Sequence, residues 1–321
     1  MPRRRLLEKE ENMITDDKVI ESMVLYEKDP EKKIAWITFN RPDKNNCLPC
    51  FAFYERIPDL IRDAEMDDDV KVIIFRGNGP CFGSGADASE LGYYIGYGSG
   101  KTKEESRRPS QRRRIYPDRD GIWGPKGMEP TIMNCLKVTI SQVHGYCYGG
   151  HFQIAMASDM VICSDDAYFT HPVFRYLGVE GNVGLYVDLM GLRRVKELML
   201  TGRPFDALEA ERYGMVNKVV TKDKLEETVL EYAQACALQT VDSIVIGKSL
   251  FEAHQGVRGY FTSGILGYMG HGWITNLRTE PGEWNFVKDR RDKGTKGSFT
   301  TRDEMLPPRF RLGEARRGAK K

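Results

Sequence analysis

The sequence has no long hydrophobic run. No apolar stretch in its 321 residues approaches the roughly 18 that a membrane-spanning helix needs. The first residues, MPRRRLLEKEENM, also lack the sustained apolar segment of a secretory signal. We therefore expect a soluble, cytoplasmic protein that does not bind membranes.

Cysteine is scarce and irregularly placed. The chain has seven cysteines, and an odd number without regular spacing is typical of buried thiols in a reducing compartment rather than of a disulfide framework. Cys47 and Cys50 form a CxxC pair, but no second CxxC and no nearby pair of histidines accompanies it. We therefore expect no metal site.

A strong charge of one sign is absent from the body of the chain. The net charge is +2, yet residues 287–321 carry twelve Lys and Arg against five Asp and Glu, a local +7 that leaves about −5 for the rest. A second basic run spans residues 107–114. Neither run has the interleaved aromatic residues typical of nucleic-acid binding, so we do not expect nucleic acid as a partner.

Apolar periodicity predicts an α/β core followed by helices. Strands are predicted at residues 33–39, 70–75, 138–143 and 160–163, and helices from 53 to the acidic turn at 67–69 and at 152–158. Helical patterns then dominate from 182 to 254. Strand, turn, helix and strand recur in this order, which predicts a wound α/β core.

Composition divides the chain into four parts. These are a flexible N-terminal extension (1–20), the α/β core (21–205), a helical part (206–293) and a basic, extended tail (294–321). The core contains a polar and basic insertion at about 92–128, which we interpret as a lid or an assembly element.

Two glycine-rich turns, Gly83–Asp87 and His144–Gly150, each leave a strand and enter a helical stretch. Backbone N–H groups at such places lack partners within the helix and can donate to an anion or a polarised oxygen. Two of them could therefore form an oxyanion hole. The alternative from the pattern alone is a pair of tight turns without a ligand.

The motifs around these turns resemble the enoyl-CoA hydratase/isomerase (crotonase) superfamily. The matching blocks, in order, are VIIFRG at 72–77, CFGSGAD at 81–87, VHGYCYGG at 143–150, AMASDMVIC at 155–163, LTGRPF at 200–205 and ALEAERYGMV at 207–216. The resemblance implies an acyl-CoA enzyme built as a spiral of ββα units with a helical C-terminal trimerisation part. It also implies a homotrimer or homohexamer, with the CoA thioester as substrate and no separate cofactor.

The same resemblance implies roles for individual residues. Backbone N–H groups of Ala86 and Gly150 would hold the thioester oxygen, with Gly85 lining the first turn. Asp87 reads as a helix N-cap. Hydratases of this family use two glutamates, but the corresponding positions here hold Gln153 and Val173. Neither side chain can act as a general acid or base, so an ordinary two-glutamate hydration mechanism is not expected.

Other residues remain candidates for proton transfer. Ungapped spacing places Glu180 where related ring-forming and ring-opening enzymes carry an aspartate, which makes Glu180 the leading candidate. A shifted alignment instead places Asn182 where dienoyl-CoA isomerases carry an aspartate. His151, next to Gly150, could donate to substrate or pack within a helix.

The remaining candidates concern substrate binding. Tyr93 and Tyr94 could wall a pocket for a bulky or cyclic acyl group. Tyr148, His171, Arg175 and Tyr176 are polar neighbours along the same stretches. The cations considered for the phosphates of CoA are Arg41, Lys44, Lys288, Arg290 and Lys293.

We therefore expect a hydratase/isomerase-like lyase that stabilises a thioester enolate with a nonstandard acid/base set. The alternative is a hydrolase that opens the ring of a cyclic β-oxoacyl-CoA. An RNA-binding protein on the same scaffold is a third, less favoured interpretation.

Overall fold

The computed structural model describes residues 13–91, 127–176, 181–273 and 278–312, together with isolated residues between 102 and 124. Within these residues, six strands form a mixed sheet in the order β1-β2-β3-β4-β6-β9. Their bounds are β1 Val24–Asp29, β2 Ile34–Phe39, β3 Val72–Gly77, β4 Val138–Val143, β6 Met160–Ser164 and β9 Lys218–Val220. The α/β prediction is confirmed.

Only β1 runs antiparallel to its neighbour in this sheet; the other pairs are parallel. Every residue of β2 is buried, as expected for a strand covered on both faces. The predicted strands at 33–39, 70–75, 138–143 and 160–163 correspond to β2, β3, β4 and β6. A second sheet contains β5 Tyr146–Tyr148, β7 Tyr168–Thr170 and β8 Phe205–Asp206.

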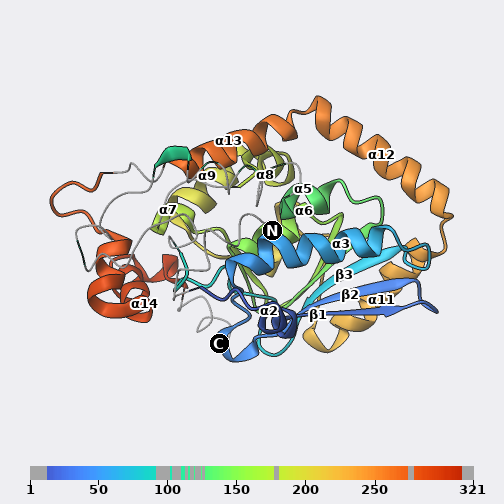
Figure 1. Cartoon of the computed structure of the whole chain (residues 1–321), viewed down its shortest axis with the longest axis horizontal. Coiled ribbons are helices and arrows are strands. Elements are labelled where there is room, and N and C mark those ends of the chain that lie inside the picture. Colours follow the sequence, from blue (N-terminus) through green and yellow to red (C-terminus); the bar gives the residue numbers. More distant parts are fainter. Residues whose placement is uncertain are drawn as a thin grey trace.

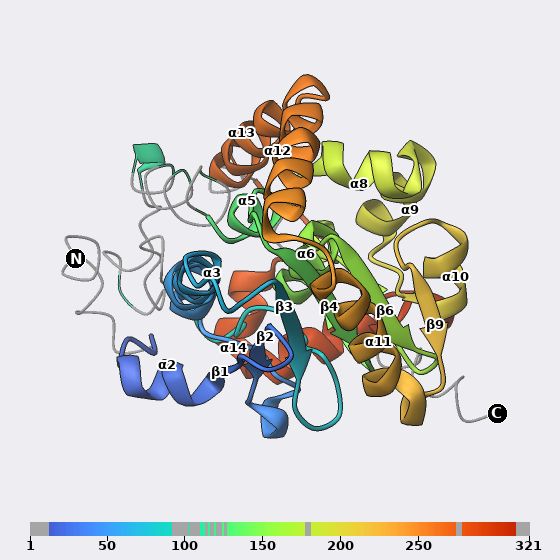
Figure 2. The ribbon, with the colours of Figure 1, turned by 90° about the vertical axis from the view of Figure 1, so that its right-hand side faces the viewer.

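Helices cover both faces of the larger sheet (Figures 1 and 2). The described helices are α2 Asp17–Met23, α3 Ile57–Glu65, α5 Met128–Met133, α6 Gly150–Ala157, α7 Val173–Tyr176, α8 Val183–Met190, α9 Leu192–Thr201, α10 Ala207–Arg212, α11 Leu225–Ala237, α12 Val241–Val257, α13 Tyr260–Trp273 and α14 Phe286–Glu304. A π-helical turn at Ala52–Arg56 leads into α3. Leu225, Val229 and Ala233 of α11 pack on one face of the sheet, and the main core lies on the other. No described helix is long and apolar enough to cross a membrane.

The structure differs from the sequence predictions at both ends. Part of the predicted N-terminal extension is ordered, because Ile20 of α2 is buried in the main core and the Ile14 N–H donates to Glu90 at 2.7 Å. The predicted extended tail is helical up to Glu304, since α14 continues past a bend at Gly294. Most of the insertion at 92–128 lies outside the described residues, so its predicted role as a lid or assembly element stays a prediction.

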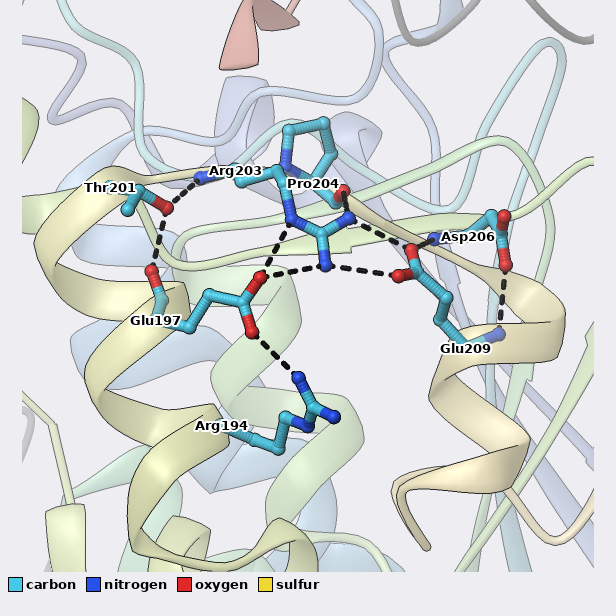
Figure 3. A network of polar contacts seen from close by, with 7 residues as sticks. All are labelled: Arg194, Glu197, Thr201, Arg203, Pro204, Asp206 and Glu209. Atoms are coloured by element: carbon cyan, nitrogen blue, oxygen red, sulfur yellow. Dashed lines mark hydrogen bonds and ion pairs between the residues drawn. The ribbon is translucent and has the colours of Figure 1, made fainter. Parts of the chain in front are cut away.

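Charged side chains fasten the segment between α9 and α10. The Arg203 guanidinium lies between two carboxylates and donates to Glu197 at 3.1 Å and to Glu209 at 2.9 Å (Figure 3). Asp206 and Glu209 also form a capping box that starts α10. Arg203 of the LTGRPF block thus links α9 and α10 through ion pairs with one glutamate on each helix.

A buried arginine holds the end of α14 to the core. Arg175 of α7 forms an ion pair with Asp303 at 2.9 Å, and its side chain is 1% exposed. It also donates to the carbonyl oxygens of Gly202 and Phe310. Arg302 returns a hydrogen bond to the Arg175 carbonyl at 3.1 Å. The last part of the described chain is therefore attached to the core and does not extend freely.

Candidate active site

The two glycine turns lie against each other. The Gly83 N–H donates to the Tyr146 carbonyl at 2.7 Å, and the Tyr148 N–H donates back to the Gly83 carbonyl at 2.9 Å. A Cβ placed on Gly85 would lie 3.5 Å from the Gly150 nitrogen and 3.0 Å from the Tyr148 carbonyl oxygen. Since Gly85 also has a φ of +96°, a side chain here would be both crowded and strained.

One N–H of the first turn remains available. The others donate inside the protein: Ser84 to the Asn45 carbonyl (3.0 Å), Gly85 to His151 Nδ1 (3.0 Å) and Asp87 to the Leu48 carbonyl (2.7 Å). Ala86 lies between them and is partly exposed. Within the described part of the chain, its N–H has no acceptor.

The second turn leaves a comparable donor. Gly149 has a φ of +57°, and its N–H donates to the Thr170 carbonyl at 3.1 Å. Gly150 is the first residue of α6, and its N–H finds no acceptor among the residues described. The positive end of the helix dipole adds to the attraction for negative charge at this point. Both N–H groups singled out in the sequence are therefore available to a ligand oxygen.

His151 supports the first turn from within the core. Its fully buried ring contacts Phe39, Phe53 and Phe82 edge-on, with ring centroids 4.6 to 5.8 Å away. Burial lowers the pKa of His151 from 6.5 to about 3. The ring is therefore neutral near pH 7, with Nδ1 as acceptor from Gly85. This placement favours packing and positioning over proton transfer.

The two positions at which the resemblance implies glutamates, 153 and 173, hold glutamine and valine. Gln153 lies one turn after Gly149–Gly150 on α6; it is 3% exposed, and its Nε2 has no partner among the described residues. An amide at this place can orient water or substrate by hydrogen bonding but cannot transfer a proton. Val173 begins the short helix α7. Glu180, Tyr93 and Tyr94 lie outside the described residues, so their roles stay predictions.

Three other predicted residues are buried. Asn182 caps α8 by accepting from the Leu185 N–H at 3.2 Å, and its amide donates to the Tyr260 carbonyl at 3.3 Å. The His171 ring stacks on Phe152 with centroids 5.6 Å apart. Burial raises the pKa of Tyr148 well above its usual value, and its hydroxyl has no partner in the described structure.

The cations predicted to bind the phosphates of CoA differ in whether another group of the protein already pairs with them. Arg41 forms an ion pair with Asp87 at 2.7 Å, and Asp87 also accepts from Ser89 in a local turn instead of capping a helix. Desolvation raises the pKa of Asp87, but the hydrogen bonds from Ser89 and Arg41 outweigh it and lower the pKa overall. Lys44 is exposed, and no ion pair involves it in the described ranges.

Two of the three predicted cations of α14 already form hydrogen bonds or ion pairs within the protein. Arg290 donates to the carbonyl oxygens of Ala88 and Leu91 at 2.9 and 2.6 Å, so α14 touches the segment after the first turn. Lys293 pairs with Asp289 at 2.9 Å. Lys288 is exposed.

Sequence reasoning missed two buried glutamates. Glu90 accepts from the backbone N–H groups of Ile14 and Cys50 at 2.7 and 2.9 Å, and burial raises its pKa. Glu129 on α5 is buried and accepts from the Tyr186 hydroxyl at 2.9 Å. Glu90 lies three residues after the CFGSGAD block that carries the resemblance, and Glu129 lies in no motif; the burial of a polar side chain is not visible in the local sequence.

Known proteins resemble this chain in sequence and in fold. A family model described as enoyl-CoA hydratase/isomerase matches residues 127–258. A mevalonyl-coenzyme A hydratase from Aspergillus fumigatus is 30% identical over 217 residues, which cover 67% of this chain and 73% of the relative. A carnitinyl-CoA dehydratase from Citrobacter koseri is 29% identical over 250 residues, covering 73% and 84%. The crystal structure of an enoyl-CoA hydratase from Mycobacterium smegmatis superposes with a TM-score of 0.74 at 24% identity, covering 90% and 97%.

Proposed function

Because this chain belongs to the enoyl-CoA hydratase/isomerase family, we propose that it is a hydratase/isomerase-like lyase that stabilises the enolate of a bulky or cyclic acyl-CoA. The observation that carries the proposal is the pair of available N–H groups at Ala86 and Gly150, on two turns that lie against each other. The relatives named as a hydratase and a dehydratase support addition or removal of water.

The chemistry follows from where charge develops. Removal of a proton next to a thioester, or addition of a nucleophile to its conjugated alkene, moves negative charge onto the thioester oxygen. Two fixed N–H donors stabilise that charge without reorganisation. Loss of one donor from such a site typically costs about 3–4 kcal/mol of transition-state stabilisation. In this chain, His151 Nδ1 accepts a hydrogen bond from the Gly85 N–H, and the Leu48 carbonyl accepts one from the Asp87 N–H. These two bonds, on either side of Ala86, fix the direction of the Ala86 N–H.

The acid/base set of the proposed enzyme is nonstandard. Gln153 and Val173 supply no carboxylate, and Glu180 stays the candidate indicated by sequence spacing. A ring-opening hydrolase would use the same oxyanion site, because cleavage of a cyclic β-oxoacyl-CoA also passes through an enolate. Hydration of an enoyl-CoA and hydrolytic ring opening of a cyclic β-oxoacyl-CoA both add one water. The gain in mass is therefore the same in the two reactions, and only the structure of the product distinguishes them.

We also propose that the chain assembles as a homotrimer or homohexamer. Large apolar side chains are exposed on the two long helices α12 and α13, which run along one edge of the molecule (Figure 1). They are Ile246, Leu250, Phe251, Val257, Phe261, Leu266 and Trp273. Exposed apolar side chains gathered on neighbouring helices support contact with another protein surface.

An acyl-CoA panel tests the reaction. Linear enoyl-CoA, cyclic enoyl-CoA and cyclic β-oxoacyl-CoA are each incubated with the protein, and products are identified by mass spectrometry with fragmentation. We expect water addition with an intact ring, or loss of water in the reverse direction. A fragment carrying a new carboxylate would favour the hydrolase. Absence of both binding and conversion across the panel would refute the acyl-CoA assignment.

A further inference from the structure

Gln153 carries a buried amide whose donor group is unpaired. It lies on α6 and is 3% exposed, and its Nε2 has no hydrogen-bond partner among the described residues. The two other buried amide side chains of the described chain are paired: Asn46 Nδ2 donates to two backbone carbonyl oxygens and Asn182 Nδ2 to another. A buried N–H without an acceptor costs free energy, so an unpaired one at a candidate site indicates a group that a ligand satisfies.

The course of α6 directs this amide toward the second glycine turn. Gln153 follows Gly150 by three residues, and its backbone N–H donates to the Gly149 carbonyl at 3.1 Å, which closes the first turn of the helix. Residues three apart lie on one face of a helix with Cβ atoms about 5–6 Å apart, and long side chains lean toward the helix N-terminus. We therefore place the Gln153 amide on the Gly150 face of α6, at the end that bears the available N–H.

The two residues between Gly150 and Gln153 point to other parts of the core. The His151 ring contacts three phenylalanine rings, and its Nδ1 accepts from the first glycine turn. Phe152 packs against the rings of His171 and Tyr186. Successive residues of an α-helix are rotated by about 100°, so Gln153 faces neither of these two groups. Its side chain lies in the remaining sector, next to that of Gly150.

We propose that the Gln153 amide recognises an oxygen atom on the acyl chain, so that the substrates are acyl-CoA thioesters with a carbonyl or hydroxyl group close to the thioester. This inference rests on the proposed acyl-CoA function and names the substrate class of the same site. While the Ala86 and Gly150 N–H groups hold the thioester oxygen, Gln153 Nε2 donates to the second oxygen. Carbonyl and hydroxyl oxygens both accept such a bond. A plain hydrocarbon chain would leave the buried N–H unpaired, which is how a site built to hydrogen-bond a substrate group rejects an analogue without it.

A matched pair of ligands tests this recognition without turnover. Butyryl-CoA and 3-oxobutyryl-CoA differ only at carbon 3, which is a methylene in the first and a carbonyl in the second, and neither can lose water. The dissociation constants of both are measured by calorimetry. We expect the wild-type protein to bind 3-oxobutyryl-CoA at least about 10-fold more tightly, the scale of one hydrogen bond to a buried donor. Equal affinities would overturn the proposal.

Gln153→Met tests whether the preference comes from the amide. Methionine is also long and unbranched, but it has no donor. The variant should bind the two ligands within about 3-fold of each other, because 3-oxobutyryl-CoA alone loses a hydrogen bond. The thermal midpoint of the free protein checks the fold and should not fall, since an unpaired N–H is replaced by an apolar group. Gln153→Leu should give the same result, and a preference that persists in either folded variant would refute the role of the amide.

Gln142→Met is the matched control. Gln142 Oε1 is also buried without a partner in the described structure, but this residue lies on β4, two positions after Ile140. Ile140 packs with α11, and alternate strand residues share a face, so Gln142 lies on the side of the sheet opposite the main core that contains Phe152 and Ile154 of α6. The control should keep the wild-type preference, and an equal loss in both variants would contradict the assignment to Gln153. If the wild-type protein binds neither ligand, the proposed acyl-CoA function itself fails.

Discussion

Replacing His151 distinguishes a structural role of this residue, supporting the first glycine turn, from a role in proton transfer. The ring is fully buried, and burial lowers its pKa from 6.5 to about 3. Between these two values the unfolded chain binds a proton at this position and the folded protein does not. Stability from this residue is therefore fully present above about pH 6.5 and decreases as the pH falls towards 3. Between pH 7 and pH 5 the loss amounts to about 2 kcal/mol.

Two variants isolate this effect. His151→Asn has a side-chain oxygen near the position of Nδ1, so it can still accept from Gly85 but cannot titrate. His151→Phe keeps an aromatic ring but leaves the Gly85 N–H without an acceptor, which costs about 1–3 kcal/mol. Both variants should lose the extra decrease in stability between pH 7 and pH 5, as measured by urea unfolding at each pH.

Activity should separate the two variants. His151→Asn should retain most of kcat/KM, because the first turn keeps its hydrogen bond. His151→Phe should lose up to about 100- to 1000-fold if the Ala86 N–H moves out of place. Equal losses in both variants would refute the positioning argument, because the hydrogen bond to Gly85 would then make no difference to activity.

Three further changes test the packing around His151, the attachment of α14 to the core and the assembly of the chain through α12 and α13. Gly83→Ala places a methyl group against the His151 ring and should reduce the unfolding free energy by about 1–3 kcal/mol; an unchanged urea midpoint would contradict this. Arg175→Met leaves Asp303 without its buried partner and should cost roughly 3–5 kcal/mol and speed proteolysis after residue 300; wild-type resistance to protease would argue against the attachment. Phe251→Glu with Phe261→Glu should lower the mass measured by light scattering, since both side chains are 65% exposed on α12 and α13; an unchanged mass would exclude this face as the interface.

The strands and the glycine turns were predictable because their signals are local. β2 and β3 are dense in apolar residues, and the turns at Gly85 and Gly149 require backbone conformations that glycine adopts readily. The availability of the Ala86 N–H was expected from the resemblance. Its physical basis, the engagement of both neighbouring N–H groups by Leu48 and His151, needed the structure.

Long-range contacts explain what sequence reasoning missed. The part of α14 after Gly294 is polar and was predicted as an extended tail, yet Ser298 is buried and Arg175 holds Asp303 from 128 positions earlier in the chain. Glu129 lies on a short helix without a motif, and its partner Tyr186 is 57 positions away. Such pairs depend on how elements pack and leave no periodic pattern within either segment.

The contact of α14 with the first turn has a consequence for comparing relatives. The family match ends at residue 258, whereas Arg290 donates to the carbonyl oxygens of Ala88 and Leu91, directly after the turn that contains Ala86. A segment beyond the residues that the family model matches thus borders the turn with the available Ala86 N–H. We therefore expect changes in α14 to reach this turn through Arg290 without altering any residue of the motifs.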